Sequence, residues 1–379
     1  MSAPATSIDT FLDQPRRAST EPELDLAMLR AYSTERSVDY GCSLEDVLKL
    51  RRRVEQGANW VTVAHLLGLD NLHRADKARD AGRARSAAAF YLSASGCFRL
   101  AQAALENRPA QRLEVYRKNV SAFSAAMHQL GHRDARVAVT YRGARHGAWL
   151  FRPSANGAAP PPCVLVWGGA DGWCEAFFGS VQRFIERGLA VCLLELPGQG
   201  LARLESGAFL DASFTGMVST ALDTLTALGV CSDNFGVAGH SFGGSLAMRA
   251  CAADLRIKAC CTNGGSVDMQ QGFTKFPRVL RRVGHMVADG CSDAQVLAAM
   301  AQFDLLTSAA AMPAPVLCLH GGQDVLVSNA EAQSLLTLRG ANPSTLVYWP
   351  EGVHCLNNHS VERDCVMADW FAAQLLDLH

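Results

Sequence analysis

The sequence predicts an α/β protein in which an all-helical N-terminal domain precedes a mostly parallel, doubly wound sheet. Between about residues 43 and 131 the apolar residues recur at helical spacing, with almost no strand signal. From about residue 136 short β-branched runs alternate with helical segments, which implies right-handed crossovers between parallel strands. We therefore expect a loosely ordered lead-in over residues 1–20, a helical cap domain over 21–132 and a sheet domain over 133–379.

Composition and charge narrow the range of partners. Hydrophobic residues make up 49% of the chain and charged residues 19%, as in a globular protein with a sizeable core. The net charge is −1 and the charges are interspersed, so we expect neither nucleic acid nor an anionic membrane as a partner. No apolar run reaches the length of a membrane span and no signal-peptide pattern is present, so we expect a cytoplasmic location. The 13 cysteines lack C-x-x-C spacing, which favours buried, reduced thiols and no metal site.

Three stretches carry the helical prediction for the first domain. The first opens at Ser43, whose side chain is expected to cap a helix with Asp46 three residues on. The second, 81–107, combines helical spacing with many small residues, which indicates closely packed helices. The third, 110–131, is expected to stop at its final glycine. No fixed period repeats over three units, so a helical solenoid is rejected.

The second domain opens with two strands, 136–142 and 147–153, which are expected to pair antiparallel about a turn at Gly143–His146. Six further strands with their turns are expected at 163–169, 189–200, 234–241, 257–265, 314–324 and 345–352. Helices are expected between them at 175–188, 214–229 and 242–253, and after them at 360–378. Residues 266–312 interrupt the alternation, and we expect a helical insertion there that forms a partial lid over the carboxyl edge of the sheet.

A G-x-S-x-G pattern at Gly239–Gly243 gives the first candidate for chemistry. Ser241 follows an apolar strand and precedes a helix that begins at Phe242, which is the setting of a nucleophile elbow. The flanking glycines suit this turn because larger side chains would clash there. The start of the following helix also favours developing negative charge. Ser241 is therefore predicted to be the nucleophile.

A serine nucleophile needs a base, and the base needs an orienting acid. Asp324 and His354 each follow a strand, at the edge of the sheet where Ser241 is expected, in the chain order Ser, acid, His. They are predicted to be the acid and the base. Four rivals are weaker. His320 is assigned a structural role, and Asp304 is assigned to the surface of a helix in the insertion. The His240 side chain is expected to point away from that of Ser241, and His359 lies one turn too late in the chain.

The tetrahedral intermediate of such a reaction needs two preplaced hydrogen-bond donors. The backbone N–H of Phe242 is expected to be one, and the N–H of Ala170, in the loop after the third strand, the other. Gly168 and Gly169 are expected to let that loop pass close to Ser241.

The same loop continues with Asp171, Trp173 and Glu175. The two carboxylates are either groups at the start of a helix or polar groups at the rim of the substrate pocket. Trp173 is expected to divide its surface between the pocket wall and the core, as are Phe177 and Phe178. Asp171 is a second candidate proton donor if burial beside Glu175 and the indole raises its pKa.

The sequence lacks the usual motifs of nucleotide cofactor binding. No phosphate-binding G-x-x-x-x-G-K-[ST] loop is present. Gly198 and Gly200 begin a G-x-G, but Arg203 stands where a third glycine should be, and no helical pattern opens directly there. We therefore expect no cofactor.

Four motifs behind a helical N-terminal domain identify a resemblance: "GGADGWCE", "GHSFGG", "HGGQDVLVS" and "EGVHCLNN". From about residue 43 onward the chain resembles α/β-hydrolases of the dihydroxypseudooxynicotine hydrolase type, and fermentation-respiration switch proteins and fungal polyketide-shortening hydrolases look similar. The resemblance implies an α/β-hydrolase fold over 133–379, a homodimer in many members, and a substrate held between the two domains. It also implies that the Ser, Asp and His named above form a catalytic triad. Gly172 and Trp173 depart from the expected pattern, in which a small hydroxyl residue is common, and this bears on the substrate.

The resemblance further implies the class of reaction. Several members cleave a carbon–carbon bond beside a carbonyl, and others are esterases. We expect a cofactor-free serine hydrolase that acts on an activated carbonyl of a fairly large, partly aromatic or polyketide-like small molecule. β-Diketone hydrolysis is ranked ahead of ester or thioester hydrolysis and of acyl transfer or cyclisation. A catalytically dead binding protein is the alternative from another class.

Overall fold

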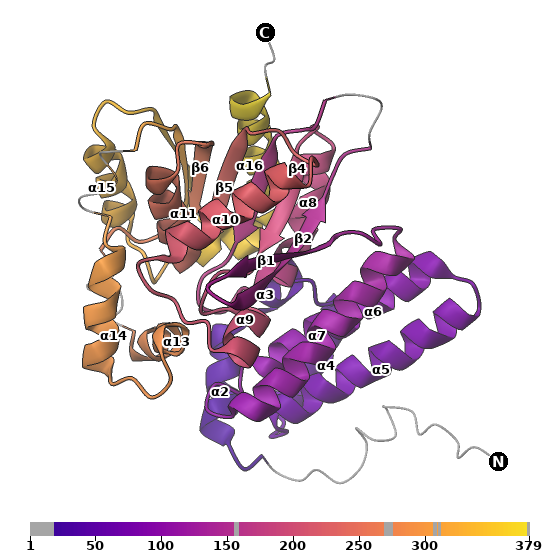
Figure 1. Cartoon of the computed structure of the whole chain (residues 1–379). Helices are drawn as coiled ribbons and strands as arrows, with labels where there is room; N and C mark the ends of the chain where they lie inside the picture. The colour runs from indigo at the N-terminus through magenta and orange to yellow at the C-terminus, as the bar shows by residue number, and fades with distance from the viewer. Residues whose placement is uncertain (1–18, 155–158, 269–275, 306–308, 310–311, 377–379) are drawn as a thin grey trace, which may run out of the picture. The chain divides into compact units, whose positions relative to one another are not determined.

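The computed structural model describes residues 19–154, 159–268, 276–305, 309 and 312–376. The chain divides into two compact units, Met1–Asp134 and Ala135–His379 (Figure 1). The lead-in predicted over residues 1–20 lies outside the described residues, apart from its last two. Among the helices of the described ranges, none has both the length and the apolar character that a bilayer crossing requires.

The first unit is entirely helical in its described part. Its helices are α2 (Pro22–Ala31), α3 (Thr34–Asp39), α4 (Leu44–Glu55), α5 (Trp60–Asp80), α6 (Ala84–Gln102) and α7 (Pro109–Gln129). The predicted cap of α4 is confirmed, because the Ser43 side chain accepts a hydrogen bond of 3.2 Å from the Asp46 backbone N–H. The end of α7 is confirmed as well, since Gly131 follows it with a left-handed φ of +87°.

The predicted close packing of small residues is visible between α5 and α6. A Cβ added to Gly68 of α5 would lie 2.6 Å from the Phe98 ring of α6, so the glycine lets the two helices approach. One helix further along, Ser95 of α6 donates a hydrogen bond of 2.8 Å to Asn119 of α7 within the buried interface. Small side chains and one satisfied polar pair thus hold α5, α6 and α7 together.

The second unit contains an eight-stranded sheet of order β1-β2-β4-β3-β5-β6-β7-β8. Its strands are β1 (Arg136–Tyr141), β2 (Ala144–Phe151), β3 (Cys163–Trp167), β4 (Ala190–Leu194), β5 (Phe235–His240), β6 (Ile257–Asn263), β7 (Val316–Gly321) and β8 (Ser344–Trp349). The pairs β1–β2 and β2–β4 are antiparallel, and every other neighbouring pair is parallel. The predicted fold class, an α/β-hydrolase sheet with an N-terminal helical domain, is therefore confirmed.

The turn between β1 and β2 is tighter than predicted. It consists of Arg142 and Gly143, with φ of +49° and +81°, and β2 already begins at Ala144. The expected turn at Gly143–His146 was too long, because a two-residue hairpin loop with positive φ at both positions matches the natural twist of the strands.

Helices cover both faces of this sheet. They are α8 (Phe178–Ile185), α9 (Gly200–Ser206), α10 (Phe214–Ala227), α11 (Phe242–Ala253), α15 (Asn329–Arg339) and α16 (Ser360–Leu375). Figure 1 shows α10 and α11 in front of the strands and α16 behind them, where Phe371 of α16 packs 6.1 Å from Phe184 of α8. The expectation that no helix opens after the G-x-G of Gly198–Gly200 was wrong, because the short helix α9 begins there.

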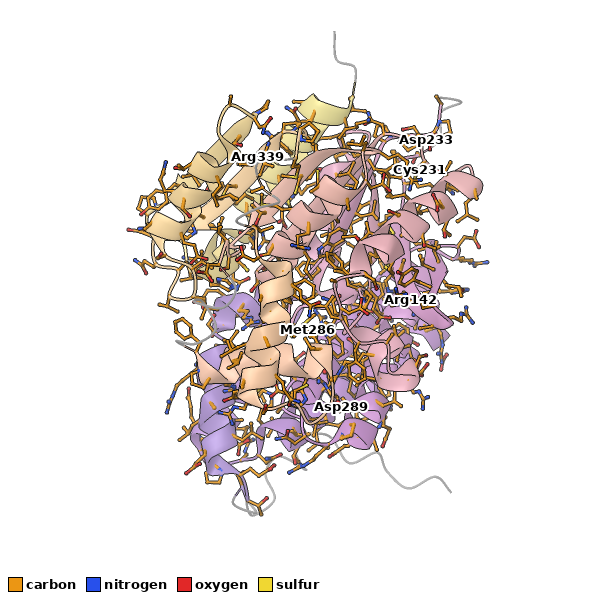
Figure 2. The ribbon with its side chains drawn as sticks, turned by 60° about the vertical axis from the view of Figure 1, so that its left-hand side comes forward. Arg142, Cys231, Asp233, Met286, Asp289 and Arg339 are labelled. Carbon is orange, nitrogen blue, oxygen red and sulfur yellow. The ribbon has the colours of Figure 1, made fainter. Side chains whose placement is uncertain are left out.

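The insertion predicted over 266–312 is helical where the structure describes it. It contains α13 (Pro277–Val287), α14 (Asp293–Met300) and the 3-10 helix η2 (Ala301–Phe303), while 269–275, 306–308 and 310–311 lie outside the described residues. Met286 and Asp289, labelled in Figure 2, tie its first helix to the segment after β4. The Met286 carbonyl accepts a hydrogen bond of 2.7 Å from the Leu210 N–H, and Asp289 lies 3.1 Å from Arg203 of α9.

The cysteines behave as the sequence predicted. Cys291 and Cys365 are partly exposed, and the other eleven of the 13 cysteines are buried as free thiols. Burial raises the pKa of Cys318 to about 12. These thiols therefore serve as small apolar side chains of the core.

Candidate active site

Ser241 stands alone between β5 and α11 in a strained conformation. Its φ is +58° and its ψ −133°, a region that residues with a Cβ rarely adopt. The turn is secured on both sides, since the Ser241 N–H donates to the Asn263 carbonyl and the Gly244 N–H donates to the Ser241 carbonyl, each at 2.8 Å. Strain of this kind persists where the surroundings over-determine it, and it is concentrated at functional sites.

The glycines around Ser241 are required by backbone contacts. A Cβ on Gly239 would lie 1.9 Å from the Gly243 carbonyl oxygen, and a Cβ on Gly243 would lie 2.6 Å from the Gly168 carbonyl oxygen. A Cβ on Gly169 would lie 2.9 Å from the Phe242 backbone nitrogen. The loop after β3 therefore passes the start of α11 backbone to backbone, as the glycine pair at 168–169 predicted.

Ser241, His354 and Asp324 form one hydrogen-bonded chain. The Ser241 Oγ lies 2.8 Å from His354 Nε2, and His354 Nδ1 lies 2.8 Å from Asp324 Oδ2. The other oxygen of Asp324 accepts hydrogen bonds from the Leu326 and Val327 N–H groups at 2.8 and 3.0 Å. The structure thus brings together three side chains that are 83 and 30 residues apart in the sequence.

The surroundings of these three side chains favour an ionised Asp324 carboxylate beside a basic His354 imidazole. Burial raises the pKa of Asp324, but the charge and hydrogen bond of His354 and the two backbone N–H groups outweigh it, so the net shift is downward. For His354 burial lowers the pKa, while Cys355 and Asp324 raise it, and the net shift is upward from 6.5 to about 10. An ionised Asp324 therefore holds the imidazole and stabilises its protonated form.

The turn that carries His354 depends on residues that the sequence reasoning missed. Cys355 and Leu356 both have positive φ, at +59° and +55°, immediately after the histidine. Asn263, at the end of β6, donates a hydrogen bond of 2.9 Å to the Cys355 carbonyl, and Arg363 donates one of 3.1 Å to the same oxygen. A polar residue at the end of an apolar strand was the only signal that could have pointed to Asn263.

The rival histidines have other partners. His240 lies 2.9 Å from the Asn263 amide nitrogen and stacks 4.5 Å from the Phe177 ring, and burial lowers its pKa well below 6.5. His320 lies 2.8 Å from Asn329 Oδ1, and His359 lies 3.7 Å from a carboxylate oxygen of Glu362 on α16. Asp304 offers its backbone carbonyl to Arg249. These residues take part in packing and surface contacts and lie outside the Ser–His–Asp chain.

The loop segment Gly168–Ala170 is held by a residue from a different turn. Gln199 donates hydrogen bonds to the Gly168 and Gly169 carbonyls at 2.7 and 2.9 Å. Ala170 follows directly after Gly169, on which an added Cβ would lie 2.9 Å from the Phe242 backbone nitrogen. That the N–H groups of Phe242 and Ala170 bind an oxyanion stays a prediction.

The two loop carboxylates have separate partners. Asp171 forms an ion pair with Arg282 of α13, and these side chains are 17% and 5% exposed. Glu175, whose side chain is 1% exposed, accepts a hydrogen bond of 3.1 Å from the Trp149 indole of β2. Because an ion pair favours the charged carboxylate, the expectation that Asp171 serves as a proton donor finds no support. Glu175 lies within the 3-10 helix η1 (Cys174–Phe177) and faces β2.

The aromatic residues of this loop belong mainly to the core. Trp173 is 2% exposed and Phe177 6%, and the Phe178 ring packs 5.4 Å from Phe151 of β2. No cluster of three or more His, Cys, Asp or Glu side chains suited to a metal ion occurs within the described ranges.

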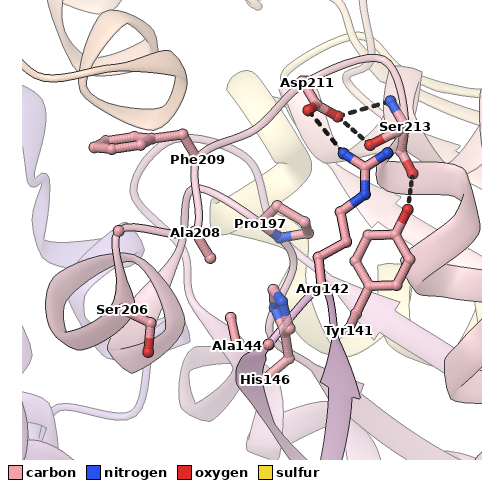
Figure 3. Close-up of a pocket in the computed structure, with 12 residues that line it drawn as sticks. Tyr141, Arg142, Ala144, His146, Pro197, Ser206, Ala208, Phe209, Asp211 and Ser213 are labelled. Atoms are coloured by element: carbon pink, nitrogen blue, oxygen red, sulfur yellow. Dashed lines mark hydrogen bonds and ion pairs between the residues drawn. The ribbon is translucent and has the colours of Figure 1, made fainter.

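A separate cavity of about 350 Å³ lies beside the β1–β2 turn (Figure 3). Its walls come from residues 141–144, His146, Pro197, residues 206–209, Asp211 and Ser213. The Arg142–Asp211 ion pair and the bond from the Tyr141 hydroxyl to the Ser213 carbonyl cross its rim. Neither Ser241 nor His354 lines it, so we do not place the Ser–His–Asp chemistry there.

Comparison with known proteins agrees with this fold. No family model matches the chain. The chain is 26% identical over 341 residues to the 2,6-dihydropseudooxynicotine hydrolase of Paenarthrobacter nicotinovorans, which covers 87% of this chain and 88% of that protein. A crystal structure of 2,6-dihydroxy-pseudo-oxynicotine hydrolase superposes with a TM-score of 0.81 at 23% identity, over 91% of this chain and 96% of the other.

Fungal hydrolases are similar over a shorter stretch. The α/β hydrolase ucsC of Acremonium sp is 31% identical over 209 residues, 49% of this chain and 42% of that protein. The hydrolase phmG of Phaeosphaeria nodorum is 32% identical over 236 residues, 57% of this chain and 52% of that protein. The chain therefore spans about half the length of these fungal relatives. The sheet order and these similarities together show the fold of the α/β-hydrolases, and the chain is similar to enzymes of that group.

Proposed function

We propose that the chain is a serine hydrolase in which Ser241 attacks a carbonyl, His354 transfers protons and Asp324 orients the imidazole. The observation that carries the proposal is the hydrogen-bonded chain from the Ser241 Oγ to Asp324, built on a strained strand-to-helix turn. This arrangement satisfies the geometric requirement for a nucleophile, a base and an orienting acid.

The reaction follows from the protonation states. Neutral His354 accepts the Ser241 proton as the Oγ bonds to the substrate carbonyl, and Asp324 stabilises the imidazolium that forms. The imidazolium then protonates the leaving group as the bond to it breaks. Water, deprotonated by the same imidazole, attacks the acyl-enzyme and releases a carboxylic acid, which restores the Ser241 hydroxyl.

The negative oxygen of the tetrahedral intermediate would be bound by the N–H groups of Phe242 and Ala170. The first N–H begins α11, where the helix dipole adds to its effect. The second lies in the loop that the 168–169 glycines bring beside Phe242. Preorganised donors of this kind each contribute about 10²–10³ in rate.

We propose hydrolysis of a carbon–carbon bond beside a carbonyl as the first candidate reaction. The similarity to the 2,6-dihydropseudooxynicotine hydrolase extends over most of both chains, and that resemblance favours a fairly large, partly aromatic substrate. A carbon leaving group departs as an enolate and must be protonated, and His354 is the donor because Asp171 is paired with Arg282. An esterase, thioesterase or acyltransferase using the same triad is the second candidate, because the triad itself does not select the leaving group. The resemblance also leads us to propose a homodimer.

Two experiments test the proposal. A fluorophosphonate probe should label the protein on Ser241, as located by mass spectrometry, and Ser241→Ala should abolish labelling and lower kcat by about 10³-fold or more. Ser334→Ala, which alters a hydroxyl on α15, is the control and should behave as the unchanged protein. An adduct on another residue, or no adduct, would refute the assignment.

The second experiment separates the two reactions. The unchanged protein is offered an aryl β-diketone and an aryl ester of similar size. Cleavage of the diketone supports the first candidate. Rapid ester turnover without diketone cleavage would make the protein an esterase or acyltransferase.

A further inference from the structure

Gln199 lies in the turn after β4, and its side chain is completely buried. The amide nitrogen donates to the Gly168 and Gly169 carbonyls at 2.7 and 2.9 Å, and the amide oxygen accepts from the Leu196 N–H at 3.0 Å. These partners fix the orientation of the amide, since only its nitrogen donates to carbonyls and only its oxygen accepts from an N–H.

The turn that carries Gln199 is itself held rigidly. Glu195, 1% exposed, accepts hydrogen bonds from the N–H groups of Gly147, Leu201 and Ala202 at 3.1, 2.8 and 3.3 Å. Gly200 has a φ of +51°, and a Cβ on it would lie 1.3 Å from a carboxylate oxygen of Glu195. Glycine at this position therefore leaves room for the Glu195 carboxylate, which joins Gly147 of β2 to the first residues of α9.

The contact with Gly169 has a geometric consequence for Ala170. In a trans peptide unit the C=O of one residue and the N–H of the next lie in one plane and point in opposite directions. Once Gln199 holds the Gly169 carbonyl, the Ala170 N–H is directed away from Gln199. Gly169 also sits against the Phe242 nitrogen, so the same peptide unit is held close to the first oxyanion donor.

We propose that Gln199 is a positioning residue, which orients the Ala170 N–H as the second oxyanion donor. The proposal rests on the proposed function, because only an acyl-transfer reaction forms this oxyanion. Gln199 itself touches no reacting atom. Its buried amide takes the place of water as the hydrogen-bond donor to the Gly168 and Gly169 carbonyls, and the fixed orientation of that amide fixes the orientation of the loop.

The test uses Gln199→Met, which keeps the side-chain length and removes both donated hydrogen bonds. Gln182→Met is the matched control, since Gln182 is an exposed residue of α8 whose amide donates a hydrogen bond of 3.1 Å to Glu186 at the end of that helix. We expect Gln199→Met to lower kcat on an aryl ester by about 10- to 100-fold, less than the loss of a donor itself, with KM changed by less than about twofold. Gln182→Met should match the unchanged protein.

A transition-state analogue separates positioning from general damage. The inhibition constant of an aryl trifluoromethyl ketone, which forms a tetrahedral adduct with serine, should rise by the same factor as kcat/KM falls. The inhibition constant of an aryl amide that binds without reacting should stay unchanged. An unchanged kcat, or equal weakening of both inhibitors, would overturn the proposal.

Hydrogen–deuterium exchange gives a readout that needs no turnover. In Gln199→Met the amides of 168–173 should exchange faster, while those of β7 and β8 keep their rates. If the unchanged protein takes no phosphonate on Ser241, the proposed function fails. If it is labelled and the loop exchange in Gln199→Met is unaltered, the Gln199 inference fails alone.

Discussion

Gly264 follows β6 and lies beside His354, the proposed catalytic base, where a side chain has little room. A Cβ on it would lie 3.3 Å from His354 Cε1 and from the Cys355 nitrogen, and 3.4 Å from Asp324 Oδ2. Its φ is +64°, which favours glycine. Gly264→Ala therefore combines a backbone cost with a push on two members of the proposed triad.

The two effects have different sizes. A left-handed alanine costs about 1–2 kcal/mol, which lowers the Tm of a 150–250-residue unit by roughly 2–8 °C. Carbon atoms in contact prefer about 3.5–4.0 Å, so the new methyl group must displace the imidazole by a few tenths of an ångström. Since a displacement of about 1 Å can cost 10²-fold in rate, we expect kcat/KM to fall by about 10-fold.

Gly229→Ala separates the backbone cost from the contact with the triad. Gly229 has a φ of +63° and no atom within 4 Å of its added Cβ. It should therefore lose a similar amount of stability and keep its activity. Thermal unfolding and kcat/KM on an aryl ester are measured for both variants at one pH.

The result that would refute this reasoning is a Gly264→Ala protein with the kcat/KM of Gly229→Ala. The alanine would then be accommodated without moving His354, and the contact would have no catalytic consequence. An equal rate loss in both variants would attribute the effect to backbone strain alone.

Four further predictions follow from the same site. Asp324→Asn should fold with an unchanged Tm and lose about 10⁴-fold in kcat, because the imidazole tautomer is no longer fixed; a loss below about 10-fold would contradict this. His354 must be neutral to accept a proton, and its pKa is raised, so kcat/KM should increase with pH above 6.5. In Asp324→Asn the rising part of this pH profile should move to lower pH. A flat profile between about pH 6 and 9 would exclude His354 as the base. Arg282→Met should destabilise by about 3 kcal/mol in chemical unfolding, and adding Asp171→Asn should restore part of the loss, whereas additive losses would show that the pair is uncoupled. Residues 135–379 expressed alone should lose activity, because the resemblance implies a substrate held between two domains; full activity would argue against that.

The site was predictable where local pattern and topology were sufficient. Ser241 was found because a buried strand, a glycine-flanked serine and a helical pattern occur in immediate succession. Asp324 and His354 were found because each follows a strand, and the carboxyl ends of parallel strands meet at one edge of a sheet. The distances of 2.8 Å between these side chains agree with that placement.

Other features could not be predicted because identical local signals have different tertiary partners. Asp171 and Glu175 are four residues apart in one loop, yet one pairs with Arg282, 111 residues on, and the other with Trp149, 26 residues back. Gln199 stands in an ordinary turn sequence, and nothing near it in the chain indicates the two carbonyls that it binds.

The sequence by itself determined the fold class, the order of the strands along the chain, and the residues proposed as the triad. These depend on periodicity, on turn residues and on the rule that parallel strands end together, all of which are encoded locally. Only the tertiary structure decided which contacts hold the site in place. These are the hydrogen bonds of Glu195 to the backbone of its turn, the hydrogen bonds of Gln199 to the loop after β3, and the lack of space beside Gly264. The physical reason is that a buried polar group must find a partner, and which partner lies within 3 Å depends on segments brought together by folding.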